Sequence, residues 1–358
     1  MKRYNHIFEK ITNIDNIMKA ITKASKGKKG RREVEQILDS PLFYAMEIKK
    51  MLLNKTYNPK KSTEFKIIDG VSRKTRIIHK PKFYPDQIIH WSIMNILEPY
   101  FMKGMYHYSC ASIKGRGIYY GSKYLKKILN SDRKNTKYCL KLDIKKYYPS
   151  IDKEILKSKF KNIFKDKELL WLLNIIVDSE ENIPIGFYTS QWFANFFLTD
   201  LDHYIKEKLK IKYYIRYLDD MILFGNNKKK LHSARILIEE YLSKENLKLK
   251  ENYSLFKVDS RCIDFLGYRF YRGYITLRRG IFLKIRRKAK RIYKKGYINI
   301  HNAYSMISYN GWIIHSNYYT YLKKNIDPYV NINKCKKIIS LHDKNKKQKI
   351  FNKLTLKY

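Results

Sequence analysis

The chain has 358 residues, enough to bury a large core and to form two or three subdomains. Its 76 Lys and Arg against 32 Asp and Glu give a formal net charge of +44. Codon bias in an AT-rich genome accounts for part of this excess of lysine. The small number of acids nevertheless favours a polyanionic partner such as nucleic acid. The apolar runs are too short to span a bilayer and no signal-peptide core is evident, so we expect a soluble cytoplasmic protein without membrane contact. The four scattered cysteines form no CxxC pair, so we expect neither a zinc site nor disulfides.

The first 60 residues are expected to form helices. A basic, polar break at residues 26–30 separates a first helix from a second one over residues 31–53. The break is equally consistent with an RNA contact and with a solvated loop. The apolar side of the second helix is expected to carry Val34, Ile37, Leu38, Phe43, Met46, Ile48 and Leu52.

Residues 65–78 predict a β-hairpin. Two strand-like runs, FKII and TRIIH, flank Asp69-Gly70, which is a favoured turn, so Lys66 and Arg76 would lie on paired strands and could point the same way. A helix is expected next, over residues 86–101. Its core positions are Ile88, Ile89, Trp91, Ile93, Met94 and Leu97.

A glycine-rich segment, SIKGRGIYYG, covers residues 112–121. Gly115-Arg116-Gly117 would let a phosphate chain approach the backbone closely, with positive charge from Arg116. The N-terminal dipole of a helix expected over residues 121–129 would add to this charge. A motif this short is weak on its own.

Two further segments place carboxylates at the ends of strands. In YCLKLDIKKYYPSI, residues 138–151, the lone acid Asp143 follows a strand-like run. In YYIRYLDDMILFG, residues 213–225, Asp219 and Asp220 interrupt an apolar run, which predicts a hairpin with acids at its turn. Adjacent carboxylates oppose each other's ionisation, so a cation is needed, and hard oxygens suit Mg²⁺ or Mn²⁺. An exposed Asp-rich turn is the simpler alternative.

Asp143 within LDIKKYYPSI, together with Tyr217-Leu218-Asp219-Asp220, resembles the palm motifs of reverse transcriptases. The resemblance covers roughly residues 30–325 and implies an α+β right-hand polymerase with fingers, an antiparallel-sheet palm and a helical thumb. The expected division is a helical N-terminal extension (1–60), fingers (61–135, with part of 155–182), palm (136–270), helical thumb (271–330) and basic tail (331–358).

The resemblance also implies roles for individual residues. Asp143, Asp219 and Asp220 would be catalytic and, with Ile144, would bind two Mg²⁺ or Mn²⁺ ions. The residues expected to bind the incoming nucleotide are Lys66, Arg76, Tyr148, Ile185, Gly186 and Gln191. The residues expected to bind template and primer are Arg116, Gly117, Tyr217, Phe265, Leu266, Gly267, Arg287 and Lys290.

Two of these positions set expectations about the incoming nucleotide. Arg76, by its place relative to Pro81, resembles the triphosphate-binding arginine of the family, whereas Lys66 is a weaker match. Tyr148 is the fifth residue after Asp143, where the family has an aromatic gate that excludes a 2′-hydroxyl. With Tyr147 adjacent, one of the two tyrosines is expected to be a core side chain.

The segment 183–209 departs from the common reverse transcriptase pattern. Ile185 precedes Gly186 where most members have a Gln, and Ser190-Gln191 follows, which resembles the enzymes of diversity-generating retroelements, a group that makes frequent errors opposite template adenine. The apolar Ile185 would offer no hydrogen bond near the nascent base pair. A helix capped by Thr189 or Ser190 is expected next. Its core positions are Phe193, Phe196, Phe197, Leu201, Tyr204 and Ile205.

The C-terminal third is predicted to be helical and basic. Residues 228–249 predict a helix and then a strand, and FLGY at residues 265–268 is similar to the primer-grip strand of the family. Tyr253-Ser254 stands where group II intron enzymes have Lys-Thr, so the lysine proposed there to protonate pyrophosphate is not evident. Residues 281–326 predict a thumb whose first helix is densely basic, suited to a duplex backbone or else simply a solvated face.

The implied activity is RNA-directed DNA synthesis by two-metal nucleotidyl transfer, with template RNA, a cDNA or RNA primer and dNTPs as partners. A diversity-generating retroelement would add error-prone copying at adenines and a small basic accessory protein. One alternative is a phage-defence, retron-like or group II-like reverse transcriptase that copies its own noncoding RNA. Another is a non-catalytic RNA-binding protein on the same fold, against which the intact set of three acids argues.

Overall fold

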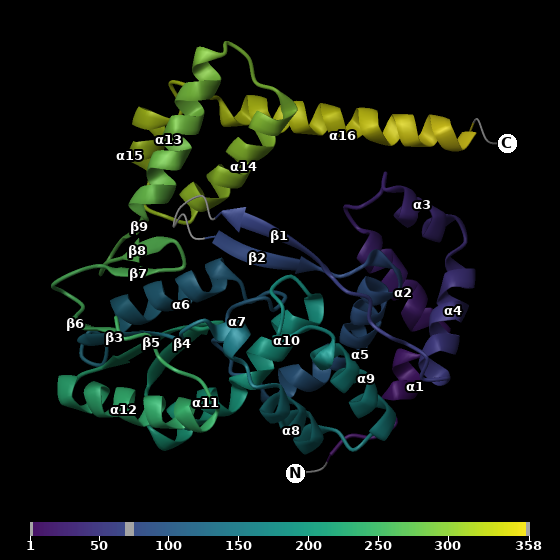
Figure 1. Ribbon diagram of the computed structural model, residues 1–358. Coiled ribbons are helices and arrows are strands. Elements are labelled where there is room, and N and C mark those ends of the chain that lie inside the picture. The colour runs from purple at the N-terminus through teal and green to yellow at the C-terminus, as the bar shows by residue number, and fades with distance from the viewer. Residues whose placement is uncertain (1–2, 69–74, 356–358) are drawn as a thin grey trace. The chain divides into compact units, whose positions relative to one another are not determined.

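A computed structural model describes residues 3–68 and 75–355, with side chains described as far as residue 345. The chain forms two compact units (Figure 1). One consists of Met1–Gly117 and Tyr138–Leu255, and the other of Ile118–Lys137 and Phe256–Tyr358. The expected turn at Asp69-Gly70 lies outside the described residues. Among the helices described, none is both long and apolar enough to cross a membrane.

The first unit begins with four helices, α1 (Phe8–Ile11), α2 (Ile14–Ser25), α3 (Arg32–Asp39) and α4 (Pro41–Leu53). The expectation of one helix over residues 31–53 is wrong. Ser40 precedes Pro41, and a residue before proline is disfavoured in helical geometry; its φ and ψ are −135° and 58°. The resulting break turns α4, so that Phe43 and Met46 are 61% and 57% exposed instead of facing the core.

Strands β1 (Thr63–Ile68) and β2 (Thr75–Lys80) form the expected antiparallel hairpin. Directly opposite residues share a face of a sheet, and Arg76 lies opposite Ile67 while Lys66 lies opposite Ile77. Lys66 and Arg76 therefore point to opposite faces, and the expectation that they point the same way is wrong. The hairpin continues through a short kinked segment, η1 (Phe83–Gln87), in which Tyr84 is extended (φ −113°, ψ 132°), into α5 (Ile88–Gly104), the core helix expected from the sequence.

The palm sheet has the strand order β4-β5-β3-β6. Its members are β3 (Tyr138–Asp143), β4 (Tyr213–Tyr217), β5 (Asp220–Gly225) and β6 (Ser254–Lys257), and β5 is antiparallel to both of its neighbours. Apolar side chains of the central strands are fully buried, including Leu140 on β3 and Leu223 on β5. The β4–β5 hairpin confirms the predicted acid-bearing turn.

The first unit contains further helical segments. They are α7 (Tyr147–Ser150), α8 (Lys153–Ile163), α9 (Lys167–Asp178), α10 (Tyr188–Phe197), α11 (Thr199–His203), the π-helical η2 (Tyr204–Lys208) and α12 (Lys228–Lys244), of which α12 packs on β5 (Figure 1). The expected cap of α10 is wrong. The helix starts after Phe187 without a side-chain cap, and Thr189 and Ser190 lie buried in its first turn.

The second unit combines α6 (Ile118–Ser131) with the C-terminal part of the chain. A three-stranded antiparallel sheet, β7 (Ile263–Phe265), β8 (Tyr268–Phe270) and β9 (Ile275–Leu277), precedes α13 (Arg279–Lys294), α14 (Ile300–Ile314), α15 (Tyr319–Asn325) and α16 (Ile332–Thr355). Helix α16 packs on α14. The mixture of helices and antiparallel sheets confirms the expected α+β class, and the exact domain boundaries stay a prediction.

Candidate active site

The three carboxylates predicted from two distant segments meet at one end of the palm sheet. Asp220 opens β5, directly opposite Asp143 on β3 and Tyr217 on β4. Asp219 occupies the β4–β5 turn, and its carbonyl oxygen accepts a hydrogen bond of 3.3 Å from the Ile144 amide. The strand register therefore holds Asp143, Ile144, Asp219 and Asp220 together, as the sequence predicted.

Lysines neutralise part of this negative charge. The Lys250 ammonium lies 2.6 Å from Oδ2 of Asp143, and the Lys141 ammonium lies 3.5 Å from Oδ2 of Asp220. The other oxygen of each of these carboxylates, Oδ1, is buried and has no hydrogen-bond partner among the described atoms. Burying a carboxylate oxygen without a hydrogen-bond partner costs free energy, so a further cation bound at these oxygens would stabilise the site.

The pKa values of the two turn carboxylates, Asp219 and Asp220, are both raised. Burial is the main cause that raises the pKa of Asp219, and the negative charge of Asp143 raises it further. Burial also raises the pKa of Asp220 to about 7, with Lys141 opposing the shift and Asp143 and Asp219 adding to it. A divalent cation between these groups would favour their ionised forms.

The donor set fits a hard cation. Carboxylate oxygens are the ligands that Mg²⁺ and Mn²⁺ prefer, and two of the oxygens here are unpartnered. In the described part of the chain, no group of three His, Cys, Asp or Glu side chains already surrounds a common metal position. Lys250 and Lys141 supply the positive charge in this arrangement, and a metal would have to draw Asp143 and Asp220 away from them.

Tyr148 and Arg76 lie close enough to Asp219 to interact with it electrostatically. Burial raises the pKa of Tyr148, the charge of Asp219 raises it further, and the positive charge of Arg76 opposes both. Arg76 likewise stabilises the ionised form of Asp219. The neighbouring Tyr147 is fully buried and donates a 2.5 Å hydrogen bond to the Ala194 carbonyl. Tyr147 is thus the core tyrosine of the pair, and the gate role of Tyr148 stays a prediction.

Ile185 and Gly186 are fixed to the root of the β1–β2 hairpin. The Ile185 carbonyl accepts a 2.8 Å hydrogen bond from the His79 amide. Gly186 has a φ of +122°, and a Cβ there would lie 2.3 Å from the His79 carbonyl oxygen, so only glycine fits. Gln191 lies one turn into α10, where its carbonyl accepts a bond from Asn195. Their roles in nucleotide binding stay predictions.

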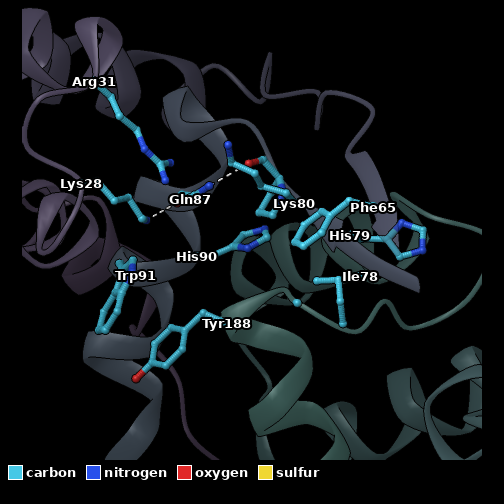
Figure 2. Close-up of a pocket in the computed structure, with 12 residues that line it drawn as sticks. Lys28, Arg31, Phe65, Ile78, His79, Lys80, Gln87, His90, Trp91 and Tyr188 are labelled. Carbon is cyan, nitrogen blue, oxygen red and sulfur yellow. Dashed lines mark hydrogen bonds between the residues drawn. The ribbon is translucent and has the colours of Figure 1, made fainter. Parts of the chain in front are cut away.

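A cavity of 290 Å³ lies beside this hairpin root (Figure 2). Its wall carries three cations, Lys28, Arg31 and Lys80, and the aromatic pair Trp91 and Tyr188, whose rings stack at 4.1 Å. Lys28 lies in the basic break at residues 26–30 and Arg31 follows it directly, so this loop forms part of the cavity wall. Sequence reasoning did not assign this cavity, because only the fold brings the break to β2 and α5.

The expected template and primer residues fall in both units, and each is described within its own. In the first unit, Arg116 is half-buried and donates a 3.1 Å hydrogen bond to the Tyr106 carbonyl, while Gly117 is exposed. Tyr217 ends β4 opposite Asp220. Arg116 is therefore held by its own loop instead of extending freely.

The second unit contains the others. Phe265 is buried in β7, and Leu266 and Gly267 form the β7–β8 turn with φ values of +54° and +82°. A Cβ on Gly267 would lie 2.6 Å from the Trp312 ring, which explains the glycine. Arg287 and Lys290 are exposed on α13, a helix without acidic residues. That face suits a polyanion, and its binding role stays a prediction.

The family model described as "Reverse transcriptase (RNA-dependent DNA polymerase)" matches residues 59–270, which contain all three acids. The chain belongs to the reverse transcriptase family. Its architecture is accordingly the α+β right-hand polymerase, with fingers, antiparallel palm and helical thumb.

Two curated relatives are also reverse transcriptases. Retron Ec73 reverse transcriptase of Escherichia coli is 32% identical over 167 residues, which is 43% of this chain and 50% of that protein. Retron Se72 reverse transcriptase of Salmonella heidelberg (strain 579083-10) is 30% identical over 164 residues, 45% of this chain and 40% of that protein. The matches thus span half or less of the length of these relatives.

Among solved structures, telomerase from Candida albicans in complex with a TWJ fragment of telomeric RNA aligns with a TM-score of 0.47 and 11% identity, over 79% of this chain and 63% of that one. Apo telomerase from Candida tropicalis, truncated from its C-terminal domain, aligns with a TM-score of 0.43 and 13% identity, over 64% and 58%.

Proposed function

We propose that this reverse transcriptase is an RNA-directed DNA polymerase that extends a primer on an RNA template with dNTPs. The observation that carries the proposal is the meeting of Asp143, Asp219 and Asp220 at the end of β3 and β5, with two buried carboxylate oxygens left unpartnered. A purely RNA-binding protein has no use for such a costly cluster, because a chain with a net charge of +44 attracts polyanions without it.

Asp143, Asp219 and Asp220, with Ile144, would hold two Mg²⁺ or Mn²⁺ ions. When bound, such ions lower the pKa of the primer 3′-hydroxyl and stabilise the charge on the triphosphate. Lys250 and Lys141, which lie beside Asp143 and Asp220, would have to give up these ion pairs when the ions bind.

Other residues of the chain would bind and orient the nucleotide. The Arg76 guanidinium, whose charge acts on both Tyr148 and Asp219, would bind phosphoryl oxygens of the triphosphate. Tyr148 would then lie against the sugar and exclude a 2′-hydroxyl. The buried Tyr147 hydroxyl, bonded to the Ala194 carbonyl, fixes the short helix that carries this ring.

The cavity of Figure 2 would hold unpaired template ahead of the site. Its cations Lys28, Arg31 and Lys80 suit phosphates, and the stacked rings of Trp91 and Tyr188 suit a base. Burial lowers the pKa of Lys28, and the neighbouring charges of Arg31 and Lys80 lower it further. A phosphate bound here would favour the charged form of Lys28.

The experiment is primer extension with purified protein, Mg²⁺ and dNTPs on matched RNA and DNA templates. Incorporation directed by the RNA template is the expected result. Binding of the hybrid without any incorporation, in Mg²⁺ and in Mn²⁺, would refute the proposal in favour of the non-catalytic alternative.

Two biological roles are supported by separate observations. The retron identity of both curated relatives favours an enzyme that copies its own noncoding RNA, which includes phage-defence systems. Ile185, in place of a hydrogen-bonding Gln, favours error-prone copying at adenines in a diversity-generating retroelement with a small basic accessory protein. The flanking DNA separates them: an adenine-substituted repeat pair indicates a retroelement, and a structured RNA gene without such a pair indicates the retron-like role.

A further inference from the structure

The strand that leads into the acid-bearing turn contains a fully buried arginine. Arg216 lies on β4, and its side chain and that of Asp202 on α11 are both 0% exposed. Two parallel hydrogen bonds join them, from Nε to Oδ1 at 2.8 Å and from Nη2 to Oδ2 at 2.5 Å. The pair is therefore bidentate, the geometry that fixes a guanidinium most firmly.

The remaining donors of the guanidinium point at the turn and at α10. Nη1 donates to the Leu218 carbonyl at 3.1 Å and to Oδ1 of Asn195 at 3.3 Å, and Nη2 donates to the Asn195 carbonyl at 3.3 Å. Leu218 immediately precedes Asp219 and has a φ of +54°, a left-handed conformation that a leucine rarely adopts. The contact with Arg216 thus lies at the strained residue of the turn.

The other members of the network are themselves fixed. Tyr214 donates a 2.7 Å bond to Oδ1 of Asp202, and Asn195 donates a 2.8 Å bond to the Ala111 carbonyl. The backbone of Arg216 pairs with the segment around Ser109 through bonds of 2.9 Å and 3.1 Å. Helix α10 through Asn195, helix α11 through Asp202, and the segment 108–110 together therefore fix the position of the guanidinium.

A buried ion pair is weak as a device for stability, because apolar residues of similar volume often serve as well. It is well suited to fixing one conformation. We propose that Arg216, oriented by Asp202 and Asn195, is a positioning residue that holds the Leu218 carbonyl and so keeps the left-handed turn that presents Asp219 beside Asp143. This inference rests on the proposed polymerase function for its consequence, the rate of the chemical step.

Arg216→Lys tests the inference, because one ammonium keeps the positive charge but cannot reach Asp202 and the Leu218 carbonyl together. Lys159→Gln is the matched control. Lys159 is also a buried cation of the first unit, 2.6 Å from Asp200 and 3.2 Å from Glu245, but it belongs to α8 and makes no contact with the turn. Both variants alter a buried cation of the first unit, and only Arg216→Lys disturbs the contact with Leu218.

Three quantities are compared below the melting temperature of both variants: kcat for primer extension, the Kd for primer–template, and hydrogen exchange of peptides that cover residues 213–225. Arg216→Lys is expected to lower kcat about 100-fold, the loss typical of a small misplacement of catalytic groups, with Kd within about threefold of wild type. Exchange in the turn is expected to rise. Lys159→Gln is expected to leave kcat and turn exchange near the wild-type values.

Equal kcat for the two variants, or unchanged exchange in the turn of Arg216→Lys, would overturn the inference. If Arg216→Lys does not fold, Asp202→Asn replaces it, since it keeps the side-chain shape but removes the charge and one of the two acceptor oxygens that orient the guanidinium. A wild type that extends no primer contradicts the proposed polymerase, and turn exchange alone then decides whether Arg216 holds the turn.

Discussion

Protonation of His90 is predicted to destabilise the first unit. His90 is 2% exposed on α5, its ring lies 5.1 Å from that of Phe187, and its Nδ1 has no partner among the described atoms. Burial lowers its pKa from 6.5 to about 3. Lys28, Arg31 and Lys80 line the same cavity as His90 (Figure 2).

The sign and size of the effect follow from the two pKa values. Between pH 6.5 and pH 3 the unfolded chain binds a proton at His90 and the folded chain does not, so stability is lost as pH falls through this range. Each pH unit below 6.5 costs about 1.4 kcal/mol, so the loss is about 2 kcal/mol between pH 7.5 and pH 5.

Urea unfolding at these two pH values measures the loss, with wild type, His90→Phe and His232→Gln compared. His90→Phe keeps a ring of similar shape without a titrating nitrogen, and is expected to be less sensitive to acid than wild type by about 2 kcal/mol. His232 is exposed on α12, so its replacement is expected to change nothing. The reasoning fails if His90→Phe and wild type lose the same stability on acidification.

Three further substitutions test the nucleotide side of the site. Gly186→Ala should cost about 3 kcal/mol or more of stability, read from urea midpoints, because its Cβ would lie 2.3 Å from the His79 carbonyl oxygen; a shift below about 0.5 kcal/mol would contradict this packing. Tyr148→Ala should admit ribonucleotides, measured as the ratio of kcat/KM for dNTP and rNTP, whereas an unchanged ratio would place the gate at another residue. Ile185→Gln should lower misincorporation opposite template adenine, since apolar shape alone discriminates by only about 1–3 kcal/mol, and sequencing of cDNA from both enzymes with equal error rates would remove Ile185 from the explanation.

Local sequence patterns were sufficient for the elements whose contacts are close in the chain. The β4–β5 hairpin and the placement of Asp219 and Asp220 at its junction follow from an apolar run interrupted by two acids. The same logic failed at residues 31–53, where helical periodicity was followed across Ser40-Pro41 although proline restricts the residue before it. It also failed for Lys66 and Arg76, because strand pairing, not spacing, decides which residues share a face.

The remaining features depend on contacts between distant segments. The ion pair of Lys250 with Asp143 joins residues that no periodicity relates. Arg216 did carry a signal, a charge at the centre of the apolar run YYIRY, which is unfavourable in a buried strand unless a counter-ion is present. Its partner Asp202 is on another element, so the sequence could flag the arginine without revealing what it holds.

The measurement that tests the account most directly is primer extension by Asp219→Asn beside Asp39→Asn, with binding of the same RNA–DNA primer–template determined for both. Asp39 is exposed on α3, so Asp39→Asn removes one negative charge, as Asp219→Asn does, but at a position outside the palm sheet. The account predicts that Asp219→Asn binds the hybrid like wild type and incorporates no dNTP in Mg²⁺ or Mn²⁺, while Asp39→Asn does both. Synthesis by Asp219→Asn near the wild-type rate would contradict the assignment of the carboxylates as the catalytic centre.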